Sequence, residues 1–163
     1  MMTLEELAKR VQALEDMEEI KKLHHDYIFL LCDKQYEKML DFFTDDARVQ
    51  INTPYMCNGK NEIAKFFREV LAKRGGKKGG SVLTMPVITV DGNSAKGYWT
   101  MHKLFDDRDV PDIIAPSKWL QGKYDCEYAK QDGKWKFSYM RYMAWPVPLP
   151  GLEEDNTKKQ TER

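Results

Sequence analysis

The sequence has few cysteines, no long apolar run and no excess of charge of either sign. Lysine plus arginine and aspartate plus glutamate number 26 each in 163 residues, so the formal net charge is zero. Balanced charge argues against a nucleic-acid partner, because phosphate binding needs a cationic surplus. No apolar run approaches the ~18 residues of a membrane span, and the acidic residues 1–6 lack a hydrophobic signal core. We therefore expect a cytoplasmic protein that contacts neither nucleic acid nor membrane.

Motifs for metals, redox chemistry and cofactors are also missing. Cys32, Cys57 and Cys126 form an odd, widely spaced set without a C-x-x-C motif, which is typical of reduced, packing cysteines. No H-x-x-x-H motif, Cys/His cluster, nucleophile motif or dinucleotide fingerprint occurs. The glycine-rich residues 74–80 lack the G-K-[ST] of a phosphate loop. We expect no metal and no cofactor.

Apolar residues at helical spacing predict three helices, over residues 3–32, 34–43 and 61–73, with Asn61 as the N-cap of the third. Leu4, Leu7, Val11 and Leu14 begin the first apolar face. This part of the helix could pack on a partner chain as a short coiled segment, but two heptads are too few to fold alone.

Alternation of apolar and polar residues, together with turn signals, predicts a sheet in the rest of the chain. A turn at 44–46 precedes a short strand at 48–52, and Asn58-Gly59 is a hairpin signal. The long strands should pair antiparallel with their neighbours in sequence, because they follow one another through short turns. They are predicted at 81–90, 95–105, 119–130 and 135–143.

Helices followed by a strand meander indicate an α+β fold. We predict a strongly curved mixed, mainly antiparallel sheet wrapped around the N-terminal helices, as one domain over residues 1–146. Residues 1–16 form a helical extension of it, and residues 147–163 a flexible tail. The connection at 106–117 should cover the sheet edge or a pocket mouth.

Several segments in this order resemble the SnoaL-like family of the nuclear-transport-factor-two-like (cystatin-like) superfamily. They are the first helix running into Asp33, then Phe42 to Ala47, Asn58 to Ile63 with Phe66-Phe67, Trp119-x-x-Gly122-x-Tyr124, and Asp132 to Phe137. The resemblance implies a cystatin-like barrel or cone with an internal pocket. The family includes dehydratases, a dehydrochlorinase, isomerases, polyketide cyclases, aldol-type lyases and proteins without known chemistry.

The nearest resemblance is to the bile-acid-dehydratase-like branch, in which elimination typically uses an Asp–His pair helped by a Tyr or Lys and an Arg. Asp33 falls on the family's Asp. The position of the His, just before Pro86, holds residues 83–85, none of which is histidine. Ile28 stands where the Tyr or Lys is expected, with Tyr27 offset by one, and Tyr139 takes the place of the Arg, with Arg141 nearby. The resemblance therefore implies incomplete elimination machinery.

Asp33 and His102 are candidate proton-transfer groups. Asp33 follows an apolar helix end, where burial and the helix dipole would raise its pKa, although it could instead only N-cap the second helix. His102 shares its strand face with Tyr98 and Thr100, which could line the cavity or face solvent. His24 is interpreted as a buried helix histidine, with a role in the pocket as the alternative.

The last strand supplies the remaining candidates. Alternation places Trp135, Phe137, Tyr139, Arg141 and Met143 on one face, and its aromatic start predicts that this face points inward. A buried Arg141 would need an anionic partner, either Asp33 or a ligand group, or it would form a structural bridge.

Together these features favour a cofactor-independent lyase or isomerase acting on a hydrophobic, aromatic or polycyclic, oxygenated small molecule. The predicted catalytic residues are Asp33, His102 and Arg141. The predicted substrate-binding residues are Tyr27, Trp99, Tyr124, Trp135, Phe137 and Tyr139. A ligand-binding or accessory protein without chemistry, or a pure dimerisation module, remains the alternative. We also expect a homodimer or another homo-oligomer.

Overall fold

The computed structural model describes residues 1–74, 79–105 and 119–146. The predicted glycine-rich loop, the 106–117 connection and the C-terminal tail lie mainly outside these ranges. Helix α1, Leu4–Cys32, opens with a capping box in which Thr3 Oγ1 accepts from the N–H of Glu6 at 3.1 Å and the Glu6 carboxylate accepts from the N–H of Thr3 at 2.7 Å. No helix within the described ranges is long and apolar enough to cross a bilayer.

The end of α1 is closed by its own backbone. Lys34 adopts a left-handed conformation, with φ of 57°. The N–H of Gln35 bonds to the Leu30 carbonyl at 2.9 Å, and that of Lys34 bonds to the Leu31 carbonyl at 3.2 Å. This is a Schellman motif, with Asp33 as the C-cap. Gln35, and not Asp33, is the N-cap residue of the next helix.

The middle of the chain differs from the prediction in its boundaries. Its elements are α2 (Tyr36–Met39), η1 (Leu40–Phe42), β1 (Phe43–Ile51), β2 (Cys57–Asn58), α3 (Gly59–Phe66), η2 (Phe67–Leu71) and α4 (Ala72–Arg74). The predicted turn at 44–46 lies inside β1, at the point where the register with the last strand shifts between Phe43 and Arg48. Asn58-Gly59 is no hairpin turn: Gly59, with φ of 77°, opens α3, whose N-cap is Asn58 and not Asn61.

The four long strands form the predicted antiparallel meander. They are β3 (Gly79–Asp91), β4 (Ser94–Phe105), β5 (Trp119–Gln131) and β6 (Lys134–Pro146). The sheet order is β2-β1-β6-β5-β4-β3, and β1 lies parallel to β6, so the sheet is mixed. Asp132 and Gly133 both have positive φ, as a tight hairpin turn between β5 and β6 requires.

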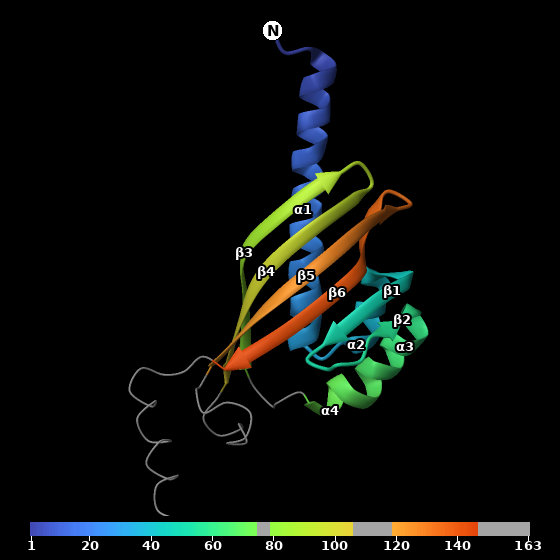
Figure 1. Ribbon diagram of the computed structural model, residues 1–163, viewed down its shortest axis with the longest axis vertical. Helices are drawn as coiled ribbons and strands as arrows, with labels where there is room; N and C mark the ends of the chain where they lie inside the picture. The colour runs from blue at the N-terminus through green and yellow to red at the C-terminus, as the bar shows by residue number, and fades with distance from the viewer. Residues whose placement is uncertain (75–78, 106–118, 147–163) are drawn as a thin grey trace, which may run out of the picture.

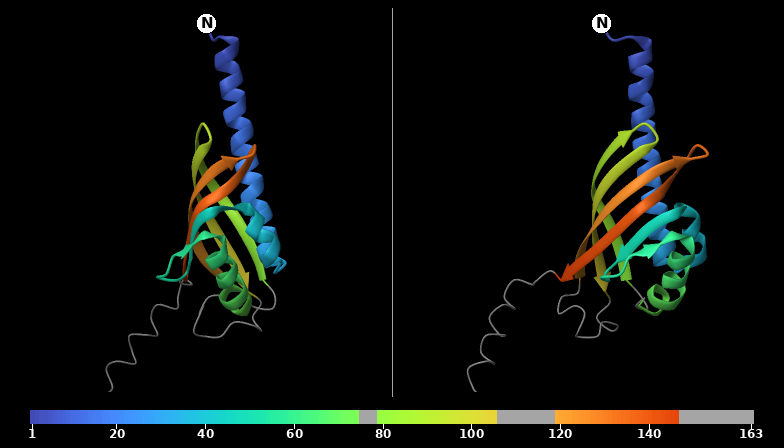
Figure 2. Two further views of the ribbon diagram at one scale, coloured as in Figure 1. Left: turned by 90° about the vertical axis from the view of Figure 1, so that its right-hand side faces the viewer. Right: turned by 45° about the vertical axis from the view of Figure 1, so that its right-hand side comes forward.

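The sheet curves around the C-terminal half of α1, while the first turns of the helix project beyond it (Figures 1 and 2). We call the sheet face that packs on α1 the inner face. Helix α1 contacts β3 and β6, and α3 packs on β1. The core contains Ile20, Leu23 and Ile28 from α1 together with aromatic residues of the inner face. The predicted α+β fold, with a curved sheet around the first helix, is confirmed.

A bulge in β6 overturns the predicted faces of this strand. Tyr128 of β5 pairs with Phe137, but the adjacent Glu127 pairs with Tyr139, so Ser138 is the extra residue. Trp135 and Phe137 are buried, and beyond the bulge burial passes to Met140 and Tyr142. Tyr139, Arg141 and Met143 therefore lie on the outer face, and the prediction that they point inward was wrong.

Candidate functional site

A buried polar cluster lies between α1 and the inner face of β4, β5 and β6. The buried side of α1 includes His24 and Tyr27, both of which are fully buried. The imidazole of His24 is surrounded by aromatic rings, with centroid distances of 4.7 Å to Trp99, 4.7 Å to Tyr124 and 5.2 Å to Phe137. The site thus places one imidazole in a mainly aromatic interior.

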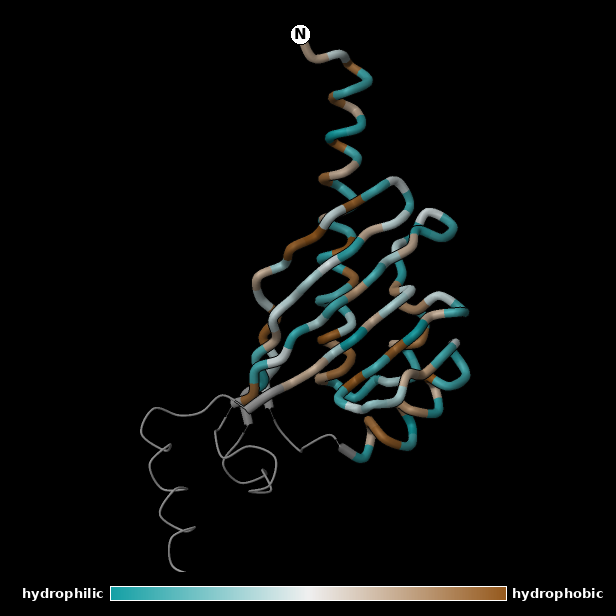
Figure 3. Tube along the Cα trace, viewed as in Figure 1, coloured by the Kyte–Doolittle hydropathy of each residue, from teal (hydrophilic) through white to brown (hydrophobic). Residues whose placement is uncertain are grey.

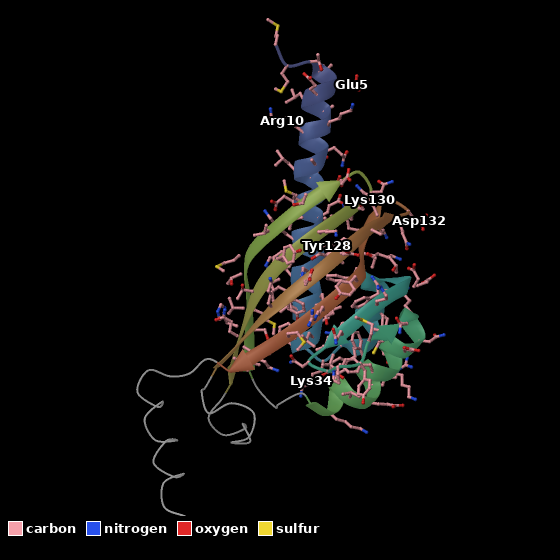
Figure 4. All side chains as sticks on the ribbon, in the orientation of Figure 1. Glu5, Arg10, Lys34, Tyr128, Lys130 and Asp132 are labelled. Carbon is pink, nitrogen blue, oxygen red and sulfur yellow. The ribbon has the colours of Figure 1, made fainter. Side chains whose placement is uncertain are left out.

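Tyr128 fixes one edge of this imidazole. The indole Nε1 of Trp99 donates to the Tyr128 hydroxyl at 2.9 Å, and the same oxygen lies 3.1 Å from Nδ1 of His24. Figure 4 marks Tyr128 in the middle of the sheet. The hydroxyl also interacts with the thiol of Cys126.

The single proton of Tyr128 permits two arrangements. If Tyr128 donates to Nδ1, Nε2 of His24 carries the ring proton. If it donates to the Cys126 sulfur, Nδ1–H of His24 donates to the Tyr128 oxygen and Nε2 is an open acceptor. In both arrangements Nε2 is the ring atom left to meet a ligand.

Two strand glycines make room for the site. A Cβ on Gly97 would lie 2.9 Å from the ring of Tyr128 and 3.3 Å from Nε1 of Trp99. A Cβ on Gly122 would lie 2.2 Å from the hydroxyl of Tyr142. A glycine inside a strand often marks such a close approach, and this was a signal that the sequence interpretation missed.

Several buried polar atoms of the cluster lack a partner. Among the described residues, His24 Nε2 and the hydroxyls of Tyr27 and Tyr142 make no hydrogen bond. Burial raises the pKa of Tyr27, and the neighbouring Cys126 and Tyr142 raise it further. The hydroxyl of Tyr124 meets only a weak acceptor, the sulfur of Met101, at 3.8 Å. Buried polar groups are nearly always paired, so these unpaired atoms are the ones able to form a hydrogen bond with a polar ligand or water.

Burial also fixes the charge state of His24. Desolvation lowers its pKa well below the ordinary value of 6.5, and the nearby His25 lowers it further. The imidazole is therefore neutral at physiological pH. The phenols around it stay protonated, because burial raises the pKa of Tyr124, Tyr128 and Tyr142 as well.

The three residues predicted as catalytic are not brought together. Asp33 is exposed at the end of α1. His102 shares its face of β4 with Tyr98 and Thr100, opposite the buried Trp99 and Met101, and so lies on the outer face. Arg141 is exposed on the outer face of β6. The N-cap role considered for Asp33 is contradicted, and the inward placement of Arg141 is wrong.

The predicted binding residues divide into three groups. Tyr27, Trp99, Tyr124 and Phe137 are buried around His24. Trp135 is buried farther along, where its Nε1 donates to Asp16 at 3.0 Å. Tyr139 lies on the outer face, with the guanidinium of Arg48 5.2 Å from its ring centroid. Trp99, Trp135 and Tyr139 therefore do not line one common cavity.

The hydrogen bond from Trp135 to Asp16 gives Trp135 a structural role. The carboxylate of Asp16 is buried in α1 and accepts from Lys130 Nζ at 2.6 Å as well as from Trp135. Burial alone would raise the pKa of Asp16, but the hydrogen bonds from Lys130 and Trp135 outweigh it and the pKa is lowered. These contacts attach the middle of α1 to the β5–β6 hairpin.

Two further features lie near the end of α1. Lys103, which the sequence interpretation missed, is on the inner face of β4; burial lowers its pKa, while Cys32 raises it and Lys34 lowers it. An external cleft of about 450 Å3 is lined by residues 34–38 with Arg68 and Ala72. In this cleft Arg68 donates two 2.6 Å bonds to Glu37, so the two charges neutralise one another. No group of three metal-ligating side chains occurs within the described part of the chain.

Solved structures share this fold at low sequence identity. A hexachlorocyclohexane dehydrochlorinase from Novosphingobium barchaimii has a TM-score of 0.70 and 19% identity, covering 88% of this chain and 96% of that chain. A proposed scytalone dehydratase from Novosphingobium aromaticivorans has a TM-score of 0.66 and 18% identity, covering 83% and 90%. A protein described as having a cystatin-like fold, from the latter organism, has a TM-score of 0.65 and 17% identity, covering 96% and 97%.

Sequence comparison identifies the family. None of the curated proteins compared with this chain matches it significantly. The profile of the SnoaL-like domain matches residues 12–141, which include the sheet and the packed part of α1. The chain therefore belongs to the SnoaL-like domain family.

Proposed function

We propose that this protein binds an uncharged, oxygenated ring compound beside His24 and catalyses an elimination such as the loss of water. The observation that carries the proposal is the buried, neutral imidazole, which is held at Nδ1 by Tyr128 and has no partner at Nε2 among the described residues. The aromatic surroundings favour a hydrophobic ring, and the unpaired hydroxyls favour an oxygen substituent. The fold relatives named as a dehydrochlorinase and a dehydratase agree with lyase chemistry.

The proposed step needs one imidazole and two phenols. The step requires the arrangement in which Nδ1–H of His24 donates to the Tyr128 oxygen, so that Nε2 is unprotonated. Nε2 then removes a proton from a carbon next to the one that bears the leaving hydroxyl. The C–H electrons form the double bond, the C–O bond breaks, and the leaving oxygen takes the proton back from His24 as water. Tyr27 and Tyr142 donate hydrogen bonds to this oxygen and stay protonated, in keeping with their raised pKa.

Asp33 does not act directly on this imidazole. It lies nine residues after His24 on the same helix, which is about 14 Å along the axis. A carboxylate at that distance cannot form a hydrogen bond to Nε2. In this proposal Asp33 contacts at most the far end of a long, polycyclic ligand, and His102 and Arg141 have no part in the reaction.

Binding without catalysis is the second candidate, and one observation favours it. Asp16 is the one buried carboxylate in the described ranges, and it is committed to Lys130 and Trp135. His24 therefore lacks the acidic partner that commonly orients a catalytic imidazole. A protein that only binds its ligand would use the same unpaired atoms.

A substrate screen with two matched variants separates these functions. Aromatic and steroid-like alcohols are tested for binding by calorimetry and for water loss by mass spectrometry. In His24→Asn, the side-chain amide replaces the Nδ1 contact with Tyr128 but nothing replaces Nε2. We expect turnover to fall ~10²–10⁴-fold, as on loss of an acid–base group, with the dissociation constant changed only several-fold.

The control is His102→Asn, at a histidine on the outer face of β4, on the opposite side of the sheet from His24. Its turnover should be unchanged. Ligand binding without product in the wild-type protein would contradict catalysis and leave the binding function. Full turnover in His24→Asn would contradict the assigned base.

A further inference from the structure

The projecting part of α1 carries an apolar stripe that nothing in the described chain covers. The stripe consists of Leu4, Leu7, Val11 and Leu14, whose exposed fractions are 83%, 44%, 44% and 58%. Figure 3 shows hydrophobic positions recurring along these turns, which extend away from the sheet. Their spacing of three, four and three residues corresponds to the a and d positions of two heptads.

The stripe points away from the rest of the protein. At 100° per residue, the buried residues Asp16, Ile20 and Tyr27 occupy one side of α1. The same rotation places the stripe on roughly the opposite side of the helix. A helix from another chain can therefore pack on the stripe without contacting the sheet that covers the opposite side of α1.

We propose that a second copy of this chain covers the stripe, with the two α1 helices forming a short parallel coiled coil. In a parallel pair the g position of one helix faces the e position of the next heptad in the other. These positions hold Arg10 and Glu15, so two attractive Arg10–Glu15 pairs flank the apolar layers. An antiparallel pair in register over the same stripe would instead bring the two Arg10 side chains together. Figure 4 shows Arg10 on the projecting turns, clear of the body.

So short a coiled coil can form here because the packing of α1 on the sheet already holds it helical. Two heptads do not form stable helices alone, because helix nucleation is unfavourable. Here α1 is a single helix whose second half is fixed by burial and by the bonds of Asp16 to Lys130 and Trp135. Association therefore does not have to form a new helix. The contact ends at Glu18, the next a position, where like charges would meet.

Sedimentation equilibrium of the full chain over a concentration series tests the proposal. The wild-type protein should dimerise, and Leu7→Glu combined with Val11→Glu should give a monomer with an unchanged melting temperature at low concentration. The matched control is Val87→Glu, an apolar residue of β3 that is 63% exposed and lies away from the helix. It should leave the dimer intact.

Charge reversal tests the parallel orientation. Arg10→Glu and Glu15→Arg should each raise the dimer dissociation constant about tenfold, which corresponds to about 1.4 kcal/mol, and the double variant should restore it. A wild-type monomer at all concentrations, or a dimer that survives Leu7→Glu with Val11→Glu, would overturn the proposal. Tighter association of the neutral variant Arg10→Gln would overturn the parallel arrangement. An antiparallel pair would lose the repulsion between two Arg10 side chains, whereas the parallel pair loses its Arg10–Glu15 attractions and should associate more weakly.

Discussion

His24 combines complete burial with a ring nitrogen that has no partner among the described residues. This combination is unfavourable for stability, because a buried polar atom without a hydrogen bond loses the water that it had in the unfolded chain. Proteins keep such residues where function requires them. At the scale of single residues, the free energy of unfolding and the turnover of His24 variants can therefore be measured separately.

The lowered pKa of His24 predicts a stability loss in mild acid. In the unfolded chain the imidazole takes up a proton near its ordinary pKa of 6.5, whereas in the folded protein it stays neutral to a lower pH. Below 6.5 the unfolded state binds more protons, so the free energy of unfolding should fall by up to about 1.4 kcal/mol per pH unit. Urea denaturation at pH 7.5 and 5.5 measures this fall. His24→Asn should largely lose this slope while His102→Asn, on the outer sheet face, keeps it; equal slopes in both variants would contradict the assignment to His24.

Asp33 offers a second test at this scale, because the family resemblance makes it catalytic while its structural setting is a helix C-cap. The carboxylate is exposed and the cap bonds are made by the backbone, so Asp33→Asn should leave the melting temperature nearly unchanged. If Asp33 moves a proton, turnover falls ~10²–10⁴-fold. On the mechanism proposed above, turnover should change by less than about tenfold. Thermal unfolding and steady-state kinetics on the same preparation decide between the two, and a large loss of turnover would restore Asp33 as the acid–base group.

At the scale of elements, the bulge at Ser138 determines which side chains β6 presents to the interior. One extra residue exchanges the two faces of a strand, because side chains alternate with a period of two. Phe137 remains inside, but Tyr139, two residues later, emerges on the outer face beside Arg48. Aromatic content alone could not reveal this, since both faces carry aromatic rings.

The two faces predict different costs for two alanine substitutions in β6. Phe137→Ala should lower the free energy of unfolding by about 3–5 kcal/mol, because it empties a fully buried site. Tyr139→Ala should cost under about 1 kcal/mol, because its half-buried ring contacts only the outer surface. Chemical denaturation of both variants measures the difference, and equal costs would mean that the bulge is misplaced.

At the scale of the whole molecule, α1 connects the candidate site to the proposed contact between chains. Its second half supplies His24 and Tyr27 to the interior, and its first turns carry the apolar stripe. The outer sheet face carries charged side chains: Lys96 lies 3.3 Å from Glu127, and Lys123 lies 4.9 Å from the ring centroid of Tyr98. Exposed apolar side chains occur there as well, at Val87 and Met143. Val87→Glu is the control in the dimer experiment because it places a charge on an exposed apolar residue outside the stripe.

The order of the elements and the antiparallel meander could be predicted from the amino acids, because both depend on local periodicity and turn residues. The family could be predicted because several segments resemble it in the same order. The sequence also identified Tyr27, Trp99, Tyr124 and Phe137 as interior aromatics, each on a regular stretch of helix or strand. Local patterns could not reveal the course of β1 through residues 44–46, the bulge at Ser138 or the contact of His24 with Tyr128. These depend on contacts between segments far apart in the chain. In the interior, side chains pack together although they lie about a hundred positions apart in the chain, as His24 and Tyr128 do. Local preference does not encode such contacts.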